Sequence, residues 1–347
     1  MKKNLESIEV HGKRVLVRCD FNVPLDEPGN ILNDFRIKQT LPTIKYLIDK
    51  GAKVILMSHL DPESTGLADK KYNLNNIAQR LSELLEINIK KSDDCIGSNT
   101  EKETLELKPR EVLLLENLRF YKEESDNNEE FAQNLAKNGD VYVNEAFSVC
   151  HRKHASVAAI TKFLPAVAGF LLEKEIDTLN KVIENPDKPM VAIIGGKKVE
   201  TKTKVIDKIS EQADVVIVSG LIKKEAVEKN INFRYPDKIV GPEDKLEALD
   251  ISQQTIDLFT VKIKSAKTVL WNGPFGKYED AEYAKGTLAI AKAIIDSNAF
   301  SVVGGGETVE FLDRENLSSK FSHVSTGGGA MLAYLSGDKL PGLENLE

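Results

Sequence analysis

Residues 190–202 read MVAIIGGKKVETK. The run 190–194 is apolar and partly β-branched, which is typical of a strand buried on both faces of a sheet. Gly195-Gly196 follows the run directly, and the chain then enters a helical segment. Glycines at such a turn let backbone N–H groups approach a phosphate closely, often at the amino end of a helix. The stretch therefore predicts one repeat of an α/β fold with an anion-binding turn.

Further apolar runs of the same kind are spread along the chain. They cover residues 14–18, 53–57, 111–115, 140–144, 214–219, 268–271 and 300–303. Segments with a helical period lie between them, including 39–50, 74–84 and 281–295. Strands that alternate with helices indicate parallel sheets with helices on both faces. The predicted fold class is therefore α/β.

The length of 347 residues exceeds the usual size of one hydrophobic core, so two domains are expected. Residues 171–188 form a charged helical pattern that ends at Asn185-Pro186, because the residue before a proline disfavours helix. The strand and helix series starts again at Met190. We therefore predict an N-terminal domain over 1–170, an interdomain helix over 171–188 and a second domain from 189.

Composition excludes several classes of protein. The net charge of −7 argues against a nucleic-acid binder, which needs a basic surface. The cysteines Cys19, Cys95 and Cys150 are widely spaced and form no CxxC pair, which favours a reducing compartment over a disulfide framework. The first residues do not form a signal peptide, and no apolar run approaches the length of a membrane span. A cytoplasmic protein is expected, with no membrane partner.

Arginine and glycine are distributed unevenly. Seven of nine arginines precede residue 171, whereas fifteen of 22 glycines follow it, including the runs 195–196, 304–306 and 327–329. Arginine binds carboxylate and phosphate through two parallel hydrogen bonds, and glycine runs cradle phosphates with backbone N–H groups. A single arginine or Gly-Gly pair would indicate only a surface charge or a turn. The repeated pattern predicts an acid-binding half and a nucleotide-binding half.

Polar and cationic residues follow four strands of the first half. Their positions are Asp20 and Asn22, His59, Arg119 and Arg152, while Arg36 opens the first helix. A single histidine is more often structural than functional, but the carboxyl ends of parallel strands meet at one edge of a sheet. The sequence therefore predicts a cationic pocket for a small polyanion.

The second half carries a phosphate-binding pattern of its own. Lys198 and Lys202 are four residues apart, so they project from one helical face and favour an anion beside them. The spacing of a Walker A loop is absent. Asn272 and Glu279 follow another strand, and Gly304–Thr308 is a further strand-to-helix turn in which the acid Glu307 could face a metal.

Eight segments resemble the phosphoglycerate kinase family and occur in the family's order. They are RCDFNVPLD, DFRIKQTLPTIKYL, GAKVILMSHL, LLLENLRFY, NEAFSVCHRKHAS, AKTVLWNGPFG, SVVGGGETV and KFSHVSTGGGA. The resemblance covers nearly the whole chain. It implies a monomer of two Rossmann-like domains with ligands in the cleft between them, the second domain over 189–330, and a C-terminal segment 331–347 that returns to the N-terminal domain. It also implies reversible phosphoryl transfer between 1,3-bisphosphoglycerate and ADP in glycolysis and gluconeogenesis, with Mg²⁺ bound with the nucleotide.

The family's functional positions map onto individual residues of this chain. The resemblance implies that phosphoglycerate is bound by Asp20, Phe21, Asn22, Arg36, His59, Arg119 and Arg152. It implies that the nucleotide is bound by Gly196, Lys198, Lys202, Asn272, Glu279, Gly305, Gly306, Glu307 and Thr308, with Glu307 at the metal. The catalytic set would be Arg36, Lys198, Lys202, Gly305 and Gly306. Phosphoryl transfer needs such cations and N–H groups around the moving phosphoryl oxygens.

The chain departs from the family pattern in three places. His59-Leu60 is followed by Asp61-Pro62 where the family has Gly-Arg-Pro, so one substrate-side arginine is missing. Ser219-Gly220 leads after a short interval to 238–240, so a piece beside the family's base pocket is absent, and the nearby Asp-Ile-Gly-Pro segment is here 250–253, DISQ. Glu307 replaces an aspartate. These changes leave two readings: an active, shortened kinase, and a catalytically weak homologue that binds a phosphometabolite or a protein. A dinucleotide-dependent dehydrogenase is excluded because no GxGxxG follows a strand.

Overall fold

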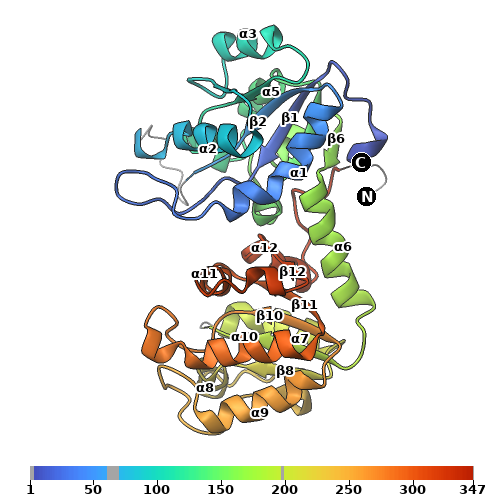
Figure 1. Cartoon of the computed structure of the whole chain (residues 1–347). Helices are drawn as coiled ribbons and strands as arrows, with labels where there is room; N and C mark the ends of the chain where they lie inside the picture. The colour runs from blue at the N-terminus through green and yellow to red at the C-terminus, as the bar shows by residue number, and fades with distance from the viewer. Residues whose placement is uncertain (1–3, 61–69, 197–198, 347) are drawn as a thin grey trace. The chain divides into compact units, whose positions relative to one another are not determined.

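The computed structural model describes residues 4–60, 70–196 and 199–346. The chain divides into two compact units, each with a sheet and surrounding helices (Figure 1). Unit 1 comprises Met1–Lys174 and Lys339–Glu347, and unit 2 comprises Glu175–Asp338. Each unit contains one six-stranded sheet in which neighbouring strands pair in parallel. The predicted α/β class with two parallel sheets is confirmed.

The sheet of unit 1 has the strand order β3-β4-β2-β1-β5-β6. Its strands are β1 (Arg14–Cys19), β2 (Lys53–Met57), β3 (Ile89–Lys91), β4 (Val112–Leu114), β5 (Val141–Glu145) and β6 (Ala166–Ala168). Its helices are α1 (Phe35–Asp49), α2 (Asn75–Leu85), α3 (Ser98–Glu106), α4 (Lys122–Ser125) and α5 (Glu129–Ala136), and α6 (Phe170–Glu184) begins here. The 3₁₀ turns are η1 (Leu5–Ser7), η2 (Lys70–Tyr72), η3 (Leu118–Phe120), η4 (Phe147–Val149) and η5 (Ala159–Lys162).

Both faces of this sheet are buried, which explains why consecutive residues in the middle of its long strands are apolar. Val15 and Val17 of β1 pack in one cluster with Ile44 of α1. Leu16, which points to the opposite face, packs in a second cluster with Phe131 of α5. Successive side chains of a strand alternate between faces, so a continuous run of apolar residues fits only a sheet covered on both sides.

The sheet of unit 2 has the strand order β12-β11-β10-β7-β8-β9. Its strands are β7 (Met190–Ile194), β8 (Val215–Val218), β9 (Ile239–Val240), β10 (Thr268–Asn272), β11 (Phe300–Gly304) and β12 (His323–Val324). Its helices are α7 (Val199–Ser210), α8 (Gly220–Glu228), α9 (Gln253–Lys264), α10 (Lys285–Ser297), α11 (Gly306–Arg314) and α12 (Gly329–Leu335). The 3₁₀ turns are η6 (Pro236–Lys238), η7 (Ala281–Tyr283) and η8 (Ser318–Lys320). Counted from β7, this is the strand order 3-2-1-4-5-6 of a Rossmann fold.

The core of unit 2 follows the same rule as that of unit 1. Val191 and Ile193 of β7 belong to a cluster with Ile290 of α10. Ala192 and Ile194 are equally buried on the other side, where α7 lies against β7 and β8. The two-sided burial again selects β-branched and other apolar residues along the whole strand.

Each sheet has a point between two neighbouring central strands at which the onward connections of those strands leave in opposite directions. In unit 1 this point lies between β1 and β5, and in unit 2 it lies between β7 and β10. Ligands of open α/β sheets bind beyond the carboxyl ends of the strands at such a point. At the one in unit 2, the backbones of Gly195 and Gly273 approach so closely that a Cβ on Gly195 would lie 2.3 Å from the Gly273 carbonyl oxygen.

The predicted strands are all present, with ends that differ by at most one residue. The structure adds β3, β6, β9 and β12, which are not among the predicted strands, because two or three residues are too few to show a period. The helix expected over 39–50 begins earlier, at Phe35, so Arg36 lies in its first turn. The helix expected over 281–295 is divided into η7 and α10.

The chain passes from unit 1 to unit 2 within α6, at Lys174. The helix ends at Glu184, two residues before Pro186, as the proline rule predicts. In unit 1, the Glu145 carboxylate accepts hydrogen bonds from Leu171 N (3.0 Å) and Leu172 N (3.4 Å) at the amino end of α6. The returning C-terminal segment begins at Lys339 in the structure, whereas the sequence placed its start at 331.

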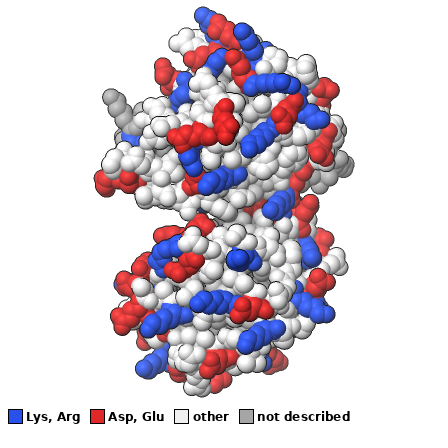
Figure 2. All heavy atoms as spheres, in the orientation of Figure 1, with Lys and Arg blue, Asp and Glu red and all other residues white. Residues whose placement is uncertain are grey.

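The surface mixes charges of both signs. On the face drawn in Figure 2, basic and acidic side chains are interspersed over each unit. Among the described residues, no helix combines the length and the apolar character needed to cross a bilayer.

We predict that Gly195→Ala destabilises the protein by about 1–3 kcal/mol or more, because the new Cβ would meet backbone atoms of Gly273 and Pro274 at 2.3–2.4 Å. Rigid backbone cannot move aside as a flexible side chain can. The measurement is the free energy of unfolding in urea. Gly306→Ala is the matched control, since nothing lies within 4 Å of a Cβ there and its stability should be nearly unchanged. Equal stability of the two variants would contradict the tight β7–β10 approach.

Candidate functional site

Asp20 anchors the cationic site of unit 1. It directly follows β1 and is 1% exposed. Its Oδ2 atom accepts hydrogen bonds from Arg36 Nη1 and Ser148 Oγ, each at 2.5 Å. Its Oδ1 atom accepts a hydrogen bond from the backbone N–H of Asn22 at 3.1 Å. Asp20 therefore holds Arg36 of α1 and the loop after β5 at the carboxyl end of β1, as the parallel topology predicts.

His59 lies at the centre of the positive charge of unit 1. It is 3% exposed, and burial lowers its pKa well below the ordinary value. The positive charges of Arg18, Arg119, Arg36 and Arg152 lower its pKa further. His59 is therefore neutral at physiological pH, and the fixed cations of the site are guanidinium groups. The structure thus brings together the predicted Arg36, His59, Arg119 and Arg152.

The loop that carries Arg119 is fixed by a buried amide. Asn117 Oδ1 accepts from Arg119 N (3.0 Å) and Leu60 N (3.1 Å), while its Nδ2 donates to the carbonyl oxygens of Leu60 and Tyr72, both at 2.9 Å. A fully satisfied buried amide specifies one geometry. Asn117 therefore ties the end of β4 to the end of β2 and presents Arg119 next to His59.

Phe21, which the resemblance assigns to phosphoglycerate binding, also has a structural role. Its side chain is fully buried in the core of unit 1, its N–H donates to Ser58 Oγ at 2.9 Å, and its C=O accepts from Val23 N at 2.9 Å. The side chain of Phe21 supports the loop after β1 from the core of unit 1. A direct role of Phe21 in substrate binding stays a prediction. Asp61 and Pro62, where the family has an additional arginine, lie outside the described residues.

Sequence reasoning missed several polar residues of this site. Arg18 is fully buried on β1, and a charge inside an apolar strand was the available signal. Ser148 bonds to Asp20, but a serine in a loop gives no signal of its own. His154 is buried, and burial together with the charge of Arg119 lowers its pKa to about 3. The run CHRKH, in which two histidines flank Arg152, could have indicated it.

Lys202 is the described cation of the phosphate site in unit 2. It lies on α7, is 9% exposed, and donates from Nζ to the carbonyl oxygen of Gly195. Burial lowers its pKa to about 8, and the charge of Glu307 opposes that shift. Gly196 has φ +80°, which a residue with a Cβ rarely adopts, and a Cβ there would lie 3.0 Å from Lys202 Nζ. Lys198 lies outside the described residues.

The amino end of α11 is arranged to receive an anion. Gly305 precedes the helix with φ +98°, and no side chain caps the first N–H groups. Asn272 is 3% exposed, and its Nδ2 has no hydrogen-bond partner among the described residues. That amide lies 3.1 Å from where a Cβ on Gly305 would stand. Thr308 Oγ1 accepts from Gly273 N at 2.9 Å and holds the helix end against the β10 loop. An unpartnered amide beside an uncapped helix end matches a phosphate group.

Two exposed carboxylates of unit 2 belong to the predicted nucleotide site. Glu307 lies in the first turn of α11, and Glu279 lies on the loop after β10. Their charges, with that of Glu310, contribute with burial to raising the pKa of Tyr278. In the described part of the chain no three His, Cys, Asp or Glu side chains form a metal cage. A single carboxylate fits Mg²⁺ that keeps several waters and is held mainly by nucleotide phosphates.

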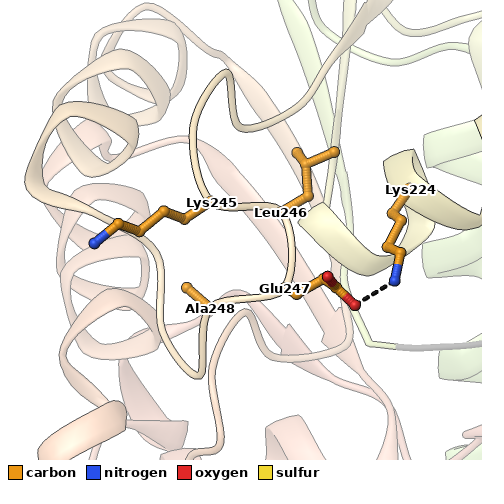
Figure 3. A pocket seen from close by; sticks show the side chains of 5 residues that line it. All are labelled: Lys224, Lys245, Leu246, Glu247 and Ala248. Atoms are coloured by element: carbon orange, nitrogen blue, oxygen red, sulfur yellow. Dashed lines mark hydrogen bonds and ion pairs between the residues drawn. The ribbon is translucent and has the colours of Figure 1, made fainter.

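The shortened region is compact. The chain leaves β8 through Ser219, whose Oγ accepts a hydrogen bond from Ile222 N and caps α8. Gly220 packs on the backbone of Leu246, and a Cβ on Gly220 would lie 2.4 Å from the Leu246 carbonyl oxygen. An open hollow of about 480 Å³ is lined by Lys224, Lys245, Leu246, Glu247 and Ala248. In Figure 3, Lys224 of α8 reaches to Glu247 across one side of this hollow.

The divergent segment after this hollow has a structural contact. Asp250 Oδ2 accepts a hydrogen bond from Gly286 N at 2.9 Å, at the start of α10. A Cβ on Gly286 would lie 2.4 Å from Asp250 Oδ1, so a residue with a side chain at position 286 would displace the Asp250 carboxylate. Asp250 thus fixes the segment 250–253 to α10.

Comparisons with known proteins agree over nearly the whole chain. The family model described as Phosphoglycerate kinase matches residues 5–230 and 221–338. A phosphoglycerate kinase of Borreliella afzelii is 42% identical over 383 aligned positions, covering 97% of this chain and 96% of that protein. One of Chlorobium phaeobacteroides is 40% identical and covers 99% of both. The solved phosphoglycerate kinase structures from Pyrococcus horikoshii and Coxiella burnetii are 32% and 31% identical, with TM-scores of 0.87 and 0.81, over 99% of this chain and 98% of theirs.

The same comparisons locate the shortening. The 383 aligned positions exceed the 347 residues of this chain, so the relative has residues that this chain lacks. The two stretches matched by the family model overlap at residues 221–230, in α8 and the turn after it. The shortening predicted from the sequence between Ser219 and 238–240 agrees with this position.

We predict that anion binding to unit 2 weakens as pH rises through about 8, because Lys202 then loses the proton that makes it cationic. Between pH 7.5 and 9.5 the affinity for ADP should fall roughly tenfold by calorimetry. Lys202→Arg is the control, since a guanidinium stays charged over this range and should remove most of the decline. An equal decline in Lys202→Arg would show that another group titrates.

Proposed function

Because the chain belongs to the phosphoglycerate kinase family, we propose that it transfers a phosphoryl group reversibly between 1,3-bisphosphoglycerate and ADP, giving 3-phosphoglycerate and ATP. This reaction is a step of glycolysis and gluconeogenesis. The observation that carries the proposal is the gathering of four arginines around the neutral His59 in unit 1. Such a site suits a small molecule with a carboxylate and a phosphate. Unit 2 supplies a separate site that suits a phosphate chain.

In the proposed role, unit 1 binds 3-phosphoglycerate. Arg119 and Arg152 neutralise its phosphate or carboxylate through bidentate hydrogen bonds, while neutral His59 donates a hydrogen bond without adding charge. Arg36, held by Asp20 at 2.5 Å, keeps a fixed direction and is assigned to the oxygens of the transferring phosphoryl group. Asn22 completes the predicted set from the loop after β1.

Unit 2 would bind the nucleotide. The backbone N–H groups of Gly305, Gly306 and Thr308, together with Asn272 Nδ2, are assigned to phosphate oxygens at the α11 end. Lys202 near Gly196 supplies positive charge to the phosphate chain. Following the resemblance, Lys198 is assigned to the transferring phosphoryl group and Glu279 to the ribose. Glu307 would help hold Mg²⁺, which neutralises phosphate charge when it is bound with the nucleotide.

The chemistry needs little covalent participation by the protein. In the direction of ATP use, a carboxylate oxygen of 3-phosphoglycerate forms a bond to the γ-phosphorus. The bond from that phosphorus to the β–γ bridging oxygen breaks, and its electron pair stays on ADP. No proton moves, because the carboxylate is already ionised. Positioning and charge stabilisation by arginine, lysine and N–H groups are therefore the protein's whole contribution.

The proposal is tested by a coupled assay of 3-phosphoglycerate phosphorylation with ATP, GTP and other nucleotides compared. Turnover with at least one nucleotide is expected, and the shortened α8–β9 region makes the preferred base an outcome of the measurement. No turnover with any nucleotide would favour the second candidate, a catalytically weak homologue that binds a phosphometabolite or a protein. The resemblance further supports a cytoplasmic monomer, for which sedimentation of the purified protein is the check.

We predict that Arg36→Ala lowers kcat at least a hundredfold and changes KM for 3-phosphoglycerate only a few-fold, because the guanidinium stabilises charge that develops in the transition state. The measurement is steady-state kinetics at saturating nucleotide. Arg14→Ala is the control. Arg14 pairs with Asp140 at the opposite, amino end of β1, so its loss should leave kcat unchanged. A raised KM with unchanged kcat would make Arg36 a binding residue only.

A further inference from the structure

Four polar residues form a continuous hydrogen-bonded chain inside unit 1. Glu124 comes from α4, Ser156 from the loop after η4, Arg18 from β1 and His59 from the end of β2. The first three are fully buried, and His59 is 3% exposed. Ser156 Oγ lies 2.6 Å from Glu124 Oε1 and 2.9 Å from Arg18 Nε, and Arg18 Nη2 lies 3.0 Å from His59 Nδ1.

The chemistry of the four groups fixes the direction of every hydrogen bond. A guanidinium has only donors, so Ser156 Oγ must accept from Arg18 Nε and use its own proton to donate to Glu124. For the same reason His59 Nδ1 must accept from Arg18 Nη2. A neutral histidine whose Nδ1 carries the lone pair has its proton on Nε2. The buried chain therefore selects one tautomer of His59.

The charge of Glu124 is compensated inside this chain. Its carboxylate also accepts from Ser156 N at 2.8 Å. His154 Nδ1 lies 3.9 Å away, but the pKa of His154 is lowered to about 3, so this histidine is neutral and offers no counter-charge. The cation linked to Glu124 is Arg18, through one serine hydroxyl. A buried carboxylate seldom adds net stability, so its effect here is on geometry.

We propose that Glu124 and Ser156 are positioning residues that hold Arg18 and, through it, keep the His59 proton on Nε2. In this tautomer Nε2 presents a donor to an anionic oxygen. In the other tautomer it would present a lone pair, which repels the same oxygen. That His59 meets 3-phosphoglycerate rests on the proposed function; the tautomer itself does not.

The test compares Ser156→Ala with wild type by two measurements. The first is ¹⁵N-edited NMR of the His59 ring in the ligand-free protein, and the second is calorimetric binding of 3-phosphoglycerate. Wild type should show the Nε2–H tautomer alone. Ser156→Ala should show a mixture of tautomers and a roughly tenfold weaker affinity for 3-phosphoglycerate, with the ADP affinity unchanged. Ser156→Thr, which keeps the hydroxyl, should restore both readouts.

Tyr142→Phe is the matched control for loss of packing. Tyr142 is fully buried, and its hydroxyl donates a hydrogen bond to the Ser156 carbonyl oxygen at 2.9 Å. This variant therefore removes a hydrogen bond to Ser156 but leaves the hydrogen bonds from Glu124 to His59 in place. It should lower the unfolding temperature while leaving the His59 tautomer and the affinity unchanged.

Several outcomes would overturn the proposal. A Ser156→Ala protein that loses only stability, with the tautomer and affinity of wild type, would make the chain structural. If Ser156→Ala does not fold, Glu124→Gln keeps the shape but removes the charge, and it must shift the tautomer and weaken binding at least threefold. If wild type binds no 3-phosphoglycerate, the proposed function fails, while the ligand-free tautomer measurement still decides the role of the chain.

Discussion

Within each unit, all six strands of the sheet are parallel to one another, and this sets where the functional side chains of that unit lie. The loops that leave the carboxyl ends emerge at one edge of each sheet, and the reversal of strand order opens a gap there between neighbouring connections. In unit 1 that point receives Asp20 from β1 and Ser148 from the loop after β5. In unit 2 it receives Gly195 from β7 and Gly273 from β10. Residues distant in the sequence become neighbours because the strands are parallel.

Burial then decides the charge of the groups that this topology gathers. His59 is kept neutral by desolvation and by four guanidinium groups that cannot lose their protons. Lys202 is partly desolvated and has a pKa of about 8, so an arriving phosphate would strengthen its charge. The two sites therefore differ in kind. Unit 1 presents fixed positive charge, whereas the described part of unit 2 presents Lys202, whose charge depends on pH, with backbone and amide N–H groups.

The shortened α8–β9 connection leaves this arrangement intact. The turns after β7 and β11 of unit 2 contain glycines. The backbone of Gly195 lies close to Gly273, and the Asn272 amide lies close to Gly305. In the shortened region, Gly220 lies against the backbone of Leu246, and Asp250 fixes the 250–253 segment to α10. The glycine turns of the candidate phosphate site are thus present in the smaller unit, and the altered residues lie where the resemblance would place a nucleotide base.

The sequence by itself determined the α/β class, the main strands and the positions that follow them. A long strand that is buried on both faces has apolar residues at consecutive positions, and such a run can be recognised in the sequence. It also indicated Asp20, Arg36, His59, Arg119, Arg152, Lys202 and the Gly304–Thr308 turn, because charged residues and glycines after such runs are unusual. It did not indicate β3, β6, β9 or β12 as strands, because they are too short to show a period. Only the tertiary structure decided that Arg18, Ser156 and Glu124 form one hydrogen-bonded chain with His59, that Asn272 is buried with an Nδ2 that has no partner in the described part of the chain, and that Phe21 faces the core. Those facts depend on contacts between distant segments, and no local pattern of residues records them.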